Sequence, residues 1–273
     1  MNTSVSSAPA PTRNHTEVSS LPVRSSLSLL GACAGLAALA FGPAASASPG
    51  GQIHYPDLWP YYAYGLRSDT VNGRQMLSFN AAIANFGDGP MELAPQNNPA
   101  TGMTDAYQRF YTHDAAGNWT MTGTQYVGTF AFHPEHNHWH FENFAAYQLR
   151  TAAPDGTVGP TILASSMKVS FCLGDDWQAR TDLEHAAPQT YTDCSQAAVQ
   201  GISVGWTDIY AWSLPGQSLD VTGLPDGTYW LLITVDPDNL LTEGGGGKGN
   251  NTNGTKFQLS NHGKRIRIIR YGF

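Results

Sequence analysis

The stretch His136-Asn-His-Trp-His-Phe-Glu-Asn-Phe-Ala-Ala-Tyr-Gln-Leu-Arg150 decides the fold, because apolar residues alternate with polar ones along most of it. Side chains of an extended strand point alternately to opposite faces, so the pattern predicts a strand with one buried face. Similar short stretches, separated by Gly, Pro, Asn and Asp, predict strands at Met76–Ala84, Thr124–Phe132, Met167–Leu173, Ser218–Val221, Thr228–Val235 and Lys264–Arg270.

No long segment has a helical period of 3.6 residues, and only Thr181–Ala187 or the neighbourhood of Gln196 could form a helical turn. Glu243–Asn251 is so rich in glycine that it predicts a flexible loop. The sequence therefore predicts an all-β fold, a β-sandwich-like single domain with long loops.

The N-terminal segment has the pattern of a secretory leader. Arg13 and Arg24 supply positive charge, Leu27–Phe41 is apolar, and Ala45-Ser-Ala47 offers small residues for cleavage. The apolar run is shorter than the roughly 20 residues that span a bilayer. We expect residues 1–47 to be a signal peptide, and residues 48–273 to be a secreted domain with no membrane attachment after cleavage.

The expected mature chain is acidic. Without Arg13, Arg24 and Glu17 of the leader, the 14 basic and 21 acidic residues fall to 12 and 20, a net charge of −8. This balance argues against nucleic acid as a partner. Cys172 and Cys194 are the two cysteines left after leader removal, and an exported protein usually pairs an even number. We therefore expect a disulfide between them.

Three histidines, His136, His138 and His140, stand at every second position, so an extended strand projects them from one side. Their imidazoles could converge on one metal ion. Zinc and copper both accept nitrogen ligands, and the spacing alone leaves the choice open. The same parity carries Glu142 to the histidine face as a candidate ligand, orienting group or base, and it carries Asn143 to the other face.

Two further regions make the chain resemble the catalytic domain of the lysyl oxidase family, as a secreted member of bacterial type. The resemblance runs in one motif order over most of the expected mature chain, from Tyr55 to the C-terminal strand. The motifs are the histidine run followed by Phe144 and Tyr147-Gln-Leu149, then Lys168-Val-Ser-Phe-Cys172, and then Gly201-Ile-Ser-Val-Gly205 leading into Asp208-Ile-Tyr210.

The resemblance implies a copper-dependent amine oxidase. His136, His138 and His140 match the copper ligands, whereas Lys168 and Tyr210 match the pair that cross-links into lysine tyrosylquinone. His133 matches a further histidine of the signature, whose role stays open. Such an enzyme would take primary amines, peptidyl lysine among them, and dioxygen, and it would release aldehyde, ammonia and hydrogen peroxide.

The base that removes the substrate proton is assigned less directly. The position that is commonly acidic in the family aligns with Glu142 or with Asn143, and face parity favours Glu142 because an amide cannot remove a proton. The rival role for Glu142 is to orient a metal-bound imidazole. A further histidine of the animal enzymes corresponds here to Ala146.

A calcium site is a second expectation from the resemblance. Its oxygen donors would come from Asp57, the Leu58 carbonyl, Glu243, Asn250 and Asn251. Here the loop before Asn250 is longer than in the family, and a glycine replaces the usual second acid. A polar turn is the structural alternative.

Two other functions fit the histidines without the resemblance. One is a zinc hydrolase, in which three imidazoles hold a metal that activates water. It requires no bond between Lys168 and Tyr210. The other is a non-catalytic extracellular β-sandwich that binds copper. Release of peroxide from a primary amine would distinguish the oxidase from both.

Overall fold

The computed structural model of the protein describes residues 51–244 and 247–273, except for the side chains of residues 167–169. The expected signal peptide lies outside the described residues. The strands are Ile53–His54 (β1), Leu58–Pro60 (β2), Tyr64–Val71 (β3), Arg74–Asn85 (β4), Met91–Asn98 (β5), Met103–His113 (β6), Trp119–His133 (β7), His138–Ala152 (β8), Val158–Phe171 (β9), Trp177–Gln178 (β10), Gln200–Ile202 (β11), Trp206–Tyr210 (β12), Ser218–Asp220 (β13), Gly227–Val235 (β14), Thr252–Ser260 (β15) and Arg265–Tyr271 (β16).

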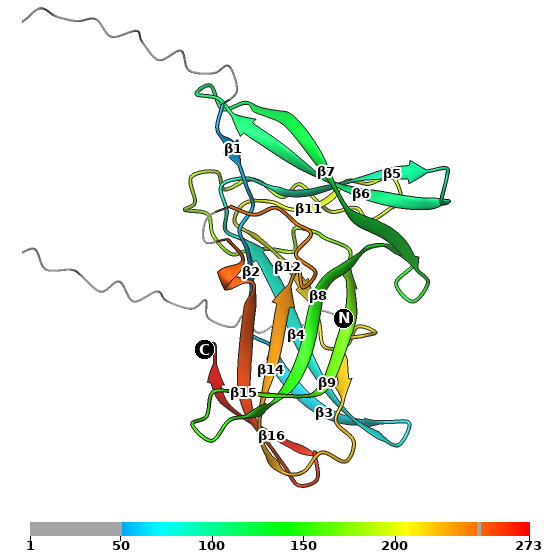
Figure 1. The fold of residues 1–273 in the computed structure, drawn as a ribbon, viewed down its shortest axis with the longest axis vertical. Coiled ribbons are helices and arrows are strands. Elements are labelled where there is room, and N and C mark those ends of the chain that lie inside the picture. Colours follow the sequence, from blue (N-terminus) through cyan, green and yellow to red (C-terminus); the bar gives the residue numbers. More distant parts are fainter. Residues whose placement is uncertain (1–50, 245–246) are drawn as a thin grey trace, which may run out of the picture. The chain divides into compact units, whose positions relative to one another are not determined.

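Two antiparallel sheets make up the fold. The larger has the order β11-β5-β6-β7-β8-β14-β15-β16, with β1 also paired to β6 and β9 to β8. The smaller has the order β10-β12-β4-β13, with β2 and β3 also paired to β4. In Figure 1, β15, β14, β8 and β9 run side by side, and β5, β6 and β7 cross beyond one end of them. The all-β prediction is confirmed.

The core lies between the two sheets. Phe79 of β4 meets Tyr147 of β8 edge to face, with ring centroids 4.8 Å apart, and both side chains are fully buried. Aromatic pairs of this geometry contribute about 1 kcal/mol beyond the apolar area that they bury. The Tyr147 hydroxyl accepts a hydrogen bond from Gln217 Nε2 at 2.8 Å, so its polar atom is also satisfied. Alternation along β8 therefore fixes which of its faces looks away from the core.

Most predicted strands are confirmed with shifted ends, but the histidine strand starts later than expected. Residues 134–137 form the turn between β7 and β8, so His136 lies in a turn and β8 begins at His138. The turn is held by bonds from the His136 and Asn137 amides to the His133 carbonyl, and Asn137 adopts a φ of 57°. Asparagine tolerates this left-handed conformation better than most residues.

The loops hold less helix than the sequence allowed. Thr181–Ala187 and the neighbourhood of Gln196 each contain a single hydrogen-bonded turn and no helix. Within the predicted flexible loop, Gly247–Asn250 forms a 3₁₀ helix, η1, the one helical element among residues 51–244 and 247–273. In the described part of the chain, no helix has the length and apolar character needed to cross a membrane.

Strands β8 and β9 depart from regular pairing next to the histidines. Phe141 pairs with Phe171 and Ala145 pairs with Val169, so three residues of β8 face Ser170 alone. The next pair joins Tyr147 to Ser166, which places two residues of β9 opposite one of β8. These are β-bulges, which often aim side chains at active sites.

Candidate functional site

Four histidines gather where β7 turns into β8. His133 ends β7 and pairs directly with His138, the first residue of β8. His136 lies in the turn between the two strands, and His140 lies two positions further along β8. The ligand atoms of His136, His138 and His140 lie within 4.8 Å of one another. One ion bound at about 2.0 Å to each nitrogen requires nitrogens no more than about 4 Å apart. The rings would close around a metal by moving a fraction of an ångström.

His140 is the histidine most clearly prepared to bind a metal. Its side chain is buried, and its Nε2 atom has no hydrogen-bond partner in the described part of the chain. Its Nδ1 atom lies 3.1 Å from Ser170 Oγ. A hydrogen bond from Nδ1 leaves the lone pair on Nε2, the arrangement found in metal-bound histidines. Burial, followed by the charge of His133, lowers the pKa of His140 to about 3, so the imidazole is neutral.

Glu142 lies on the same face of β8 as His138 and His140, and its carboxylate contacts His133. Its Oε1 atom is 2.8 Å from His133 Nε2, and His133 in turn stacks on His140 with ring centroids 4.3 Å apart. Ser170 Oγ lies 3.1 Å from His133 Nε2 as well. Asn143 follows at a φ of 60° within the bulge. Of the two candidate base positions, Glu142 is thus the one in direct contact with the histidine cluster.

Tyr210 at the end of β12 faces the same pocket as the histidines. The pocket, of about 290 Å³, is lined by His133, Glu135, His136, His140, Ser166, Ser170, Tyr210, Pro215, Gly216 and Gln217. Burial raises the pKa of the Tyr210 hydroxyl well above its ordinary value, and the nearby charge of Asp208 raises it further. The hydroxyl donates to the Cys172 carbonyl at 3.0 Å, so Tyr210 is held as a neutral phenol.

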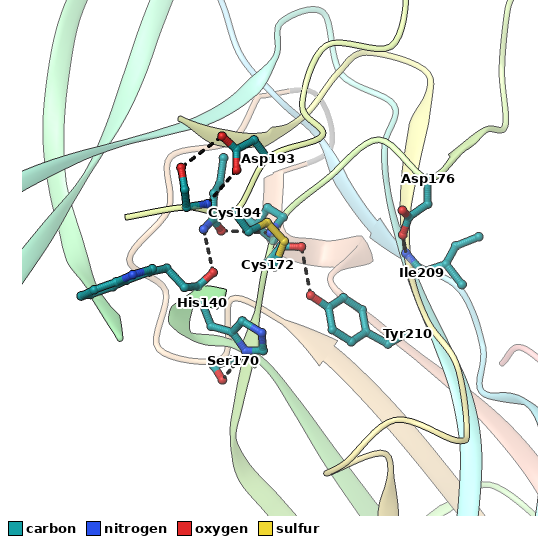
Figure 2. The surroundings of a disulfide bond; sticks show 12 residues. His140, Ser170, Cys172, Asp176, Asp193, Cys194, Ile209 and Tyr210 are labelled. Atoms are coloured by element: carbon teal, nitrogen blue, oxygen red, sulfur yellow. Dashed lines mark hydrogen bonds between the residues drawn. A yellow bond between two sulfur atoms is a disulfide. The ribbon is translucent and has the colours of Figure 1, made fainter. Parts of the chain in front are cut away.

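The disulfide between Cys172 and Cys194 is present, with Cα atoms 5.8 Å apart. Figure 2 shows His140, Ser170 and Tyr210 gathered around it. The carbonyls of both cysteines accept hydrogen bonds from residues of the site. The Cys172 carbonyl accepts from the Tyr210 hydroxyl, and the Cys194 carbonyl accepts at 2.9 Å from the amide of Trp139, the residue between His138 and His140. The bridge therefore joins the anchor of Tyr210 to the anchor of the histidine strand.

Lys168 lies in β9, in the bulge between Ser166 and Val169. Its side chain is outside the described part of the structure. The residues that flank it at two positions on either side, Ser166 and Ser170, both line the pocket. Lys168 therefore lies in the segment of β9 that borders the pocket, which Tyr210 also lines.

Three polar residues near Tyr210 were not singled out by the sequence as functional. Gln217 is buried, lines the pocket and has no partner for its Oε1 atom within the described residues. Asp208 and Asp176 line a second pocket, to which Tyr210, His136 and His138 also contribute. Burial raises the pKa of Asp208, and the charge of Asp176 adds to the shift. The motif Asp208-Ile-Tyr210 was the available signal for Asp208, whereas nothing local marks Gln217.

The expected calcium ligands also come together, about one end of β2. Asn250 Nδ2 donates to Asp57 Oδ1 at 2.8 Å, while Glu243 accepts from the Leu58 amide and from Asn251 Nδ2, both at 2.7 Å. The Oδ1 atoms of both asparagines are buried with no partner in the described part of the chain. Burial raises the pKa of Glu243. Unpartnered oxygens beside two carboxylates fit a hard cation.

Comparisons with known proteins agree on one family. The lysyl oxidase family model matches residues 96–270. Relatives include lysyl oxidase homolog 3B of Danio rerio, 30% identical over 116 residues, and lysyl oxidase homolog 3 of Homo sapiens, 31% identical over 116 residues. Each match covers 42% of this chain, and 13% and 14% of the respective relative. Lysyl oxidase homolog 2 of Bos taurus is 29% identical over 155 residues, 55% of this chain and 18% of the relative. The matched regions span less than a fifth of the length of these relatives. The family match covers more than half of this chain, which therefore belongs to the lysyl oxidase family.

Proposed function

We propose that the protein is a copper- and quinone-dependent amine oxidase that converts primary amines to aldehydes. The observation that carries the proposal is the shared pocket, which Tyr210 lines together with His133, His136 and His140. Family membership supports the same activity. Water and dioxygen would be consumed with the amine, and ammonia and hydrogen peroxide would be released with the aldehyde.

Copper would be held by His136, His138 and His140. The unpartnered Nε2 of buried His140 supports this assignment, because a buried nitrogen without a hydrogen bond costs about 1–3 kcal/mol unless a ligand fills its place. When bound, copper and the quinone would supply the oxidising power of the reaction, with dioxygen as the final electron acceptor. His138→Ala should lose both copper and the quinone, whereas retention of full activity would remove these histidines from the proposal.

The cross-link between Lys168 and Tyr210 is the sharpest test of this function. The purified protein, exposed to copper and dioxygen, should yield on peptide mapping a Lys168 peptide joined covalently to the Tyr210 peptide. Lys168→Ala should keep copper and lose the cross-link, with Lys264→Ala as a matched control that removes an exposed lysine. Two unlinked peptides from a copper-loaded, colourless protein would contradict the oxidase. Zinc binding with hydrolysis would favour the alternative enzyme.

Glu142 and His133 form the proton-accepting pair in this proposal. His133 lines the pocket, and the Glu142 carboxylate at 2.8 Å orients its ring and stabilises the cation formed when it accepts the substrate Cα proton. Glu142 thereby acts through His133. Glu142→Gln keeps the size of the side chain and removes its charge, so the rate of proton removal should fall by about 100-fold, with a larger isotope effect from a Cα-deuterated amine. An unchanged rate excludes the pair.

Gln217 is a candidate contact for the substrate amine. Its unpartnered Oε1 atom could accept a hydrogen bond from the amine nitrogen, while its Nε2 atom stays bound to Tyr147. Gln217→Met should raise KM about 10-fold, the equivalent of one hydrogen bond, and change kcat less. An equal effect on both constants would instead indicate a structural role.

Calcium is a further proposed ligand, held by Asp57, the Leu58 carbonyl, Glu243, Asn250 and Asn251. The orphaned Oδ1 atoms of Asn250 and Asn251 support it. A calcium chelator should lower the melting temperature of the wild type and leave that of Asn251→Leu unchanged. Equal melting curves of the wild type with and without chelator would refute the site.

We also propose that the protein is exported, with cleavage after Ala47. The leader pattern of residues 1–47 supports this proposal. Mass measurement of the protein recovered outside the producing cells should show an N-terminus at Ser48. Retention of the intact leader in the cell interior would contradict it.

A further inference from the structure

A second group of histidines lies apart from the pocket, where β1 joins the end of β6. His54 belongs to β1, His113 ends β6, and His185 comes from the loop between β10 and β11. Their ring centroids are 4.7, 4.8 and 6.0 Å apart. The corresponding separations for the candidate copper ligands are 4.8, 4.8 and 5.6 Å. The two groups are therefore of nearly equal size.

His54 and His185 both contact the backbone of the Asp88–Gly89 segment. His185 donates from Nδ1 to the Asp88 carbonyl at 2.9 Å, which leaves the lone pair on its Nε2 atom. This is the arrangement by which backbone carbonyls orient metal-binding imidazoles. The next residue, Gly89, touches the backbone of His54 so closely that a Cβ atom there would lie 2.3 Å from the His54 carbonyl oxygen. Asp88–Gly89 thus holds His54 and His185 together.

His54 carries the observation that points to a ligand. Its Nδ1 atom is buried and has no hydrogen-bond partner within the described residues. A buried imidazole nitrogen without a partner is costly, and a bound ion would remove the cost. Asp88 and Glu184 lie near enough to act on His54 electrostatically, so the surroundings offer negative charge to a cation.

Trp119 covers the group. It pairs with His113 across β6 and β7, and its ring lies 4.6 Å from His113, 5.2 Å from His185 and 5.5 Å from His54. The indole therefore touches all three imidazoles. It would shield a bound ion from solvent on one side and report its presence through fluorescence.

We propose that His54, His113 and His185 form a second transition-metal site, for a divalent ion of the copper or zinc class. Three imidazoles near carboxylates suit these ions and exclude magnesium and calcium, which prefer oxygen. In the described part of the chain, only His136, His138 and His140 already gather their ligand atoms within 4.8 Å. The second site would close by rotation of its rings. The ion would tie β1 and the β6–β7 hairpin, which lie together in Figure 1, to the loop that carries His185.

Copper(II) binding to the full chain tests the site in a background that lacks the first one. His138→Ala/His140→Ala should still retain about one equivalent of copper after desalting, measured by mass spectrometry of the metal. Adding His185→Ala, or in a separate protein His113→Asn, should remove that equivalent. His262→Asn, which changes an exposed histidine outside both groups, should retain it. Loss in this control, or no copper in the background protein, overturns the proposal.

Tryptophan fluorescence separates binding at this site from binding elsewhere. Copper(II) should quench part of the emission of the background protein, and this part should be absent in Trp119→Phe, which keeps the bound equivalent. Quenching that persists unchanged in Trp119→Phe would place the ion at another site. His185→Ala should also retain amine oxidase activity, because no residue of the pocket is altered; loss of activity without loss of copper would assign His185 to the pocket and refute a separate site.

Discussion

Removal of the Cys172–Cys194 bridge should weaken both the fold and the pocket. The two cysteines are 22 positions apart, and a cross-link of this span limits the unfolded chain by about 3 kcal/mol on the loop-entropy model. For a domain of this size, about 1 kcal/mol corresponds to roughly 2–4 °C. Cys172→Ala/Cys194→Ala should therefore melt roughly 6–12 °C below the oxidised wild type.

The same substitution should disturb the site through main-chain atoms. The Cys172 carbonyl holds the Tyr210 hydroxyl at 3.0 Å, and the Cys194 carbonyl holds the Trp139 amide at 2.9 Å. Both acceptors remain in the variant, but the bridge that fixes their separation is gone. Each hydrogen bond contributes about 1 kcal/mol, so copper affinity and the rate of forming the cross-linked peptide should each fall by about 5-fold.

Calorimetry and a copper titration of three samples test this reasoning. Wild type, wild type treated with a reductant, and the double variant are compared at equal protein concentration. The reduced wild type and the variant should lose the same stability, because they lack the same constraint. A variant as stable as the oxidised wild type would refute the entropy argument, and unchanged copper affinity would refute the link from the bridge to the site.

Three further substitutions follow from buried atoms. Gly205→Ala should destabilise the fold by more than 2 kcal/mol in urea unfolding, because φ is +84° and a Cβ atom would lie 2.1 Å from the Arg180 carbonyl oxygen; a smaller loss would mean that the loop gives way. Asp208→Asn should become more stable relative to the wild type as pH rises. Burial raises the pKa of the folded Asp208 carboxyl, so the stability that the protonated carboxyl gives the wild type is present below about pH 4 and is lost as pH rises through the raised pKa. Unfolding free energies at pH 4 and pH 8 check this, and an equal difference at both would contradict it. Tyr147→Phe should cost about 1–3 kcal/mol, since Gln217 Nε2 loses its partner, and a melting temperature equal to that of wild type would show that the amide finds another.

Alternating patterns predicted the strands that have one apolar face, such as β8 and β14. They failed for β6, because its polar residues are buried rather than exposed. Gln108 is fully buried and exchanges hydrogen bonds of 2.8 Å with the amide and carbonyl of Thr242, far along the chain. A polar residue satisfied by a distant partner looks like a surface residue in a sequence. Strands β3, β5 and β15 were missed as well.

The candidate site was predictable where its residues are close in sequence. The spacing of His136, His138 and His140 indicated a metal site, although the turn that holds His136 depends on bonds to His133. The second histidine group gave no signal, because pairing of β1 with β6 and docking of a loop bring its members together. Tertiary contacts of this kind leave no periodic trace.

Strand β8 is bonded to β14 and to β9 in unlike ways. Its seam with β14 runs in unbroken register from Ala145 to Thr151, whereas its seam with β9 shifts register four times. A pair of strands with fewer regular backbone hydrogen bonds is the first to shift when the sheet is strained. A covalent bond made after folding, such as the proposed link from Lys168 to Tyr210, would therefore move β9 relative to β8 and leave the β8–β14 pairing unchanged. His138 and His140 lie where β8 pairs with β7, and this part of the sheet would keep its position while the protein matures.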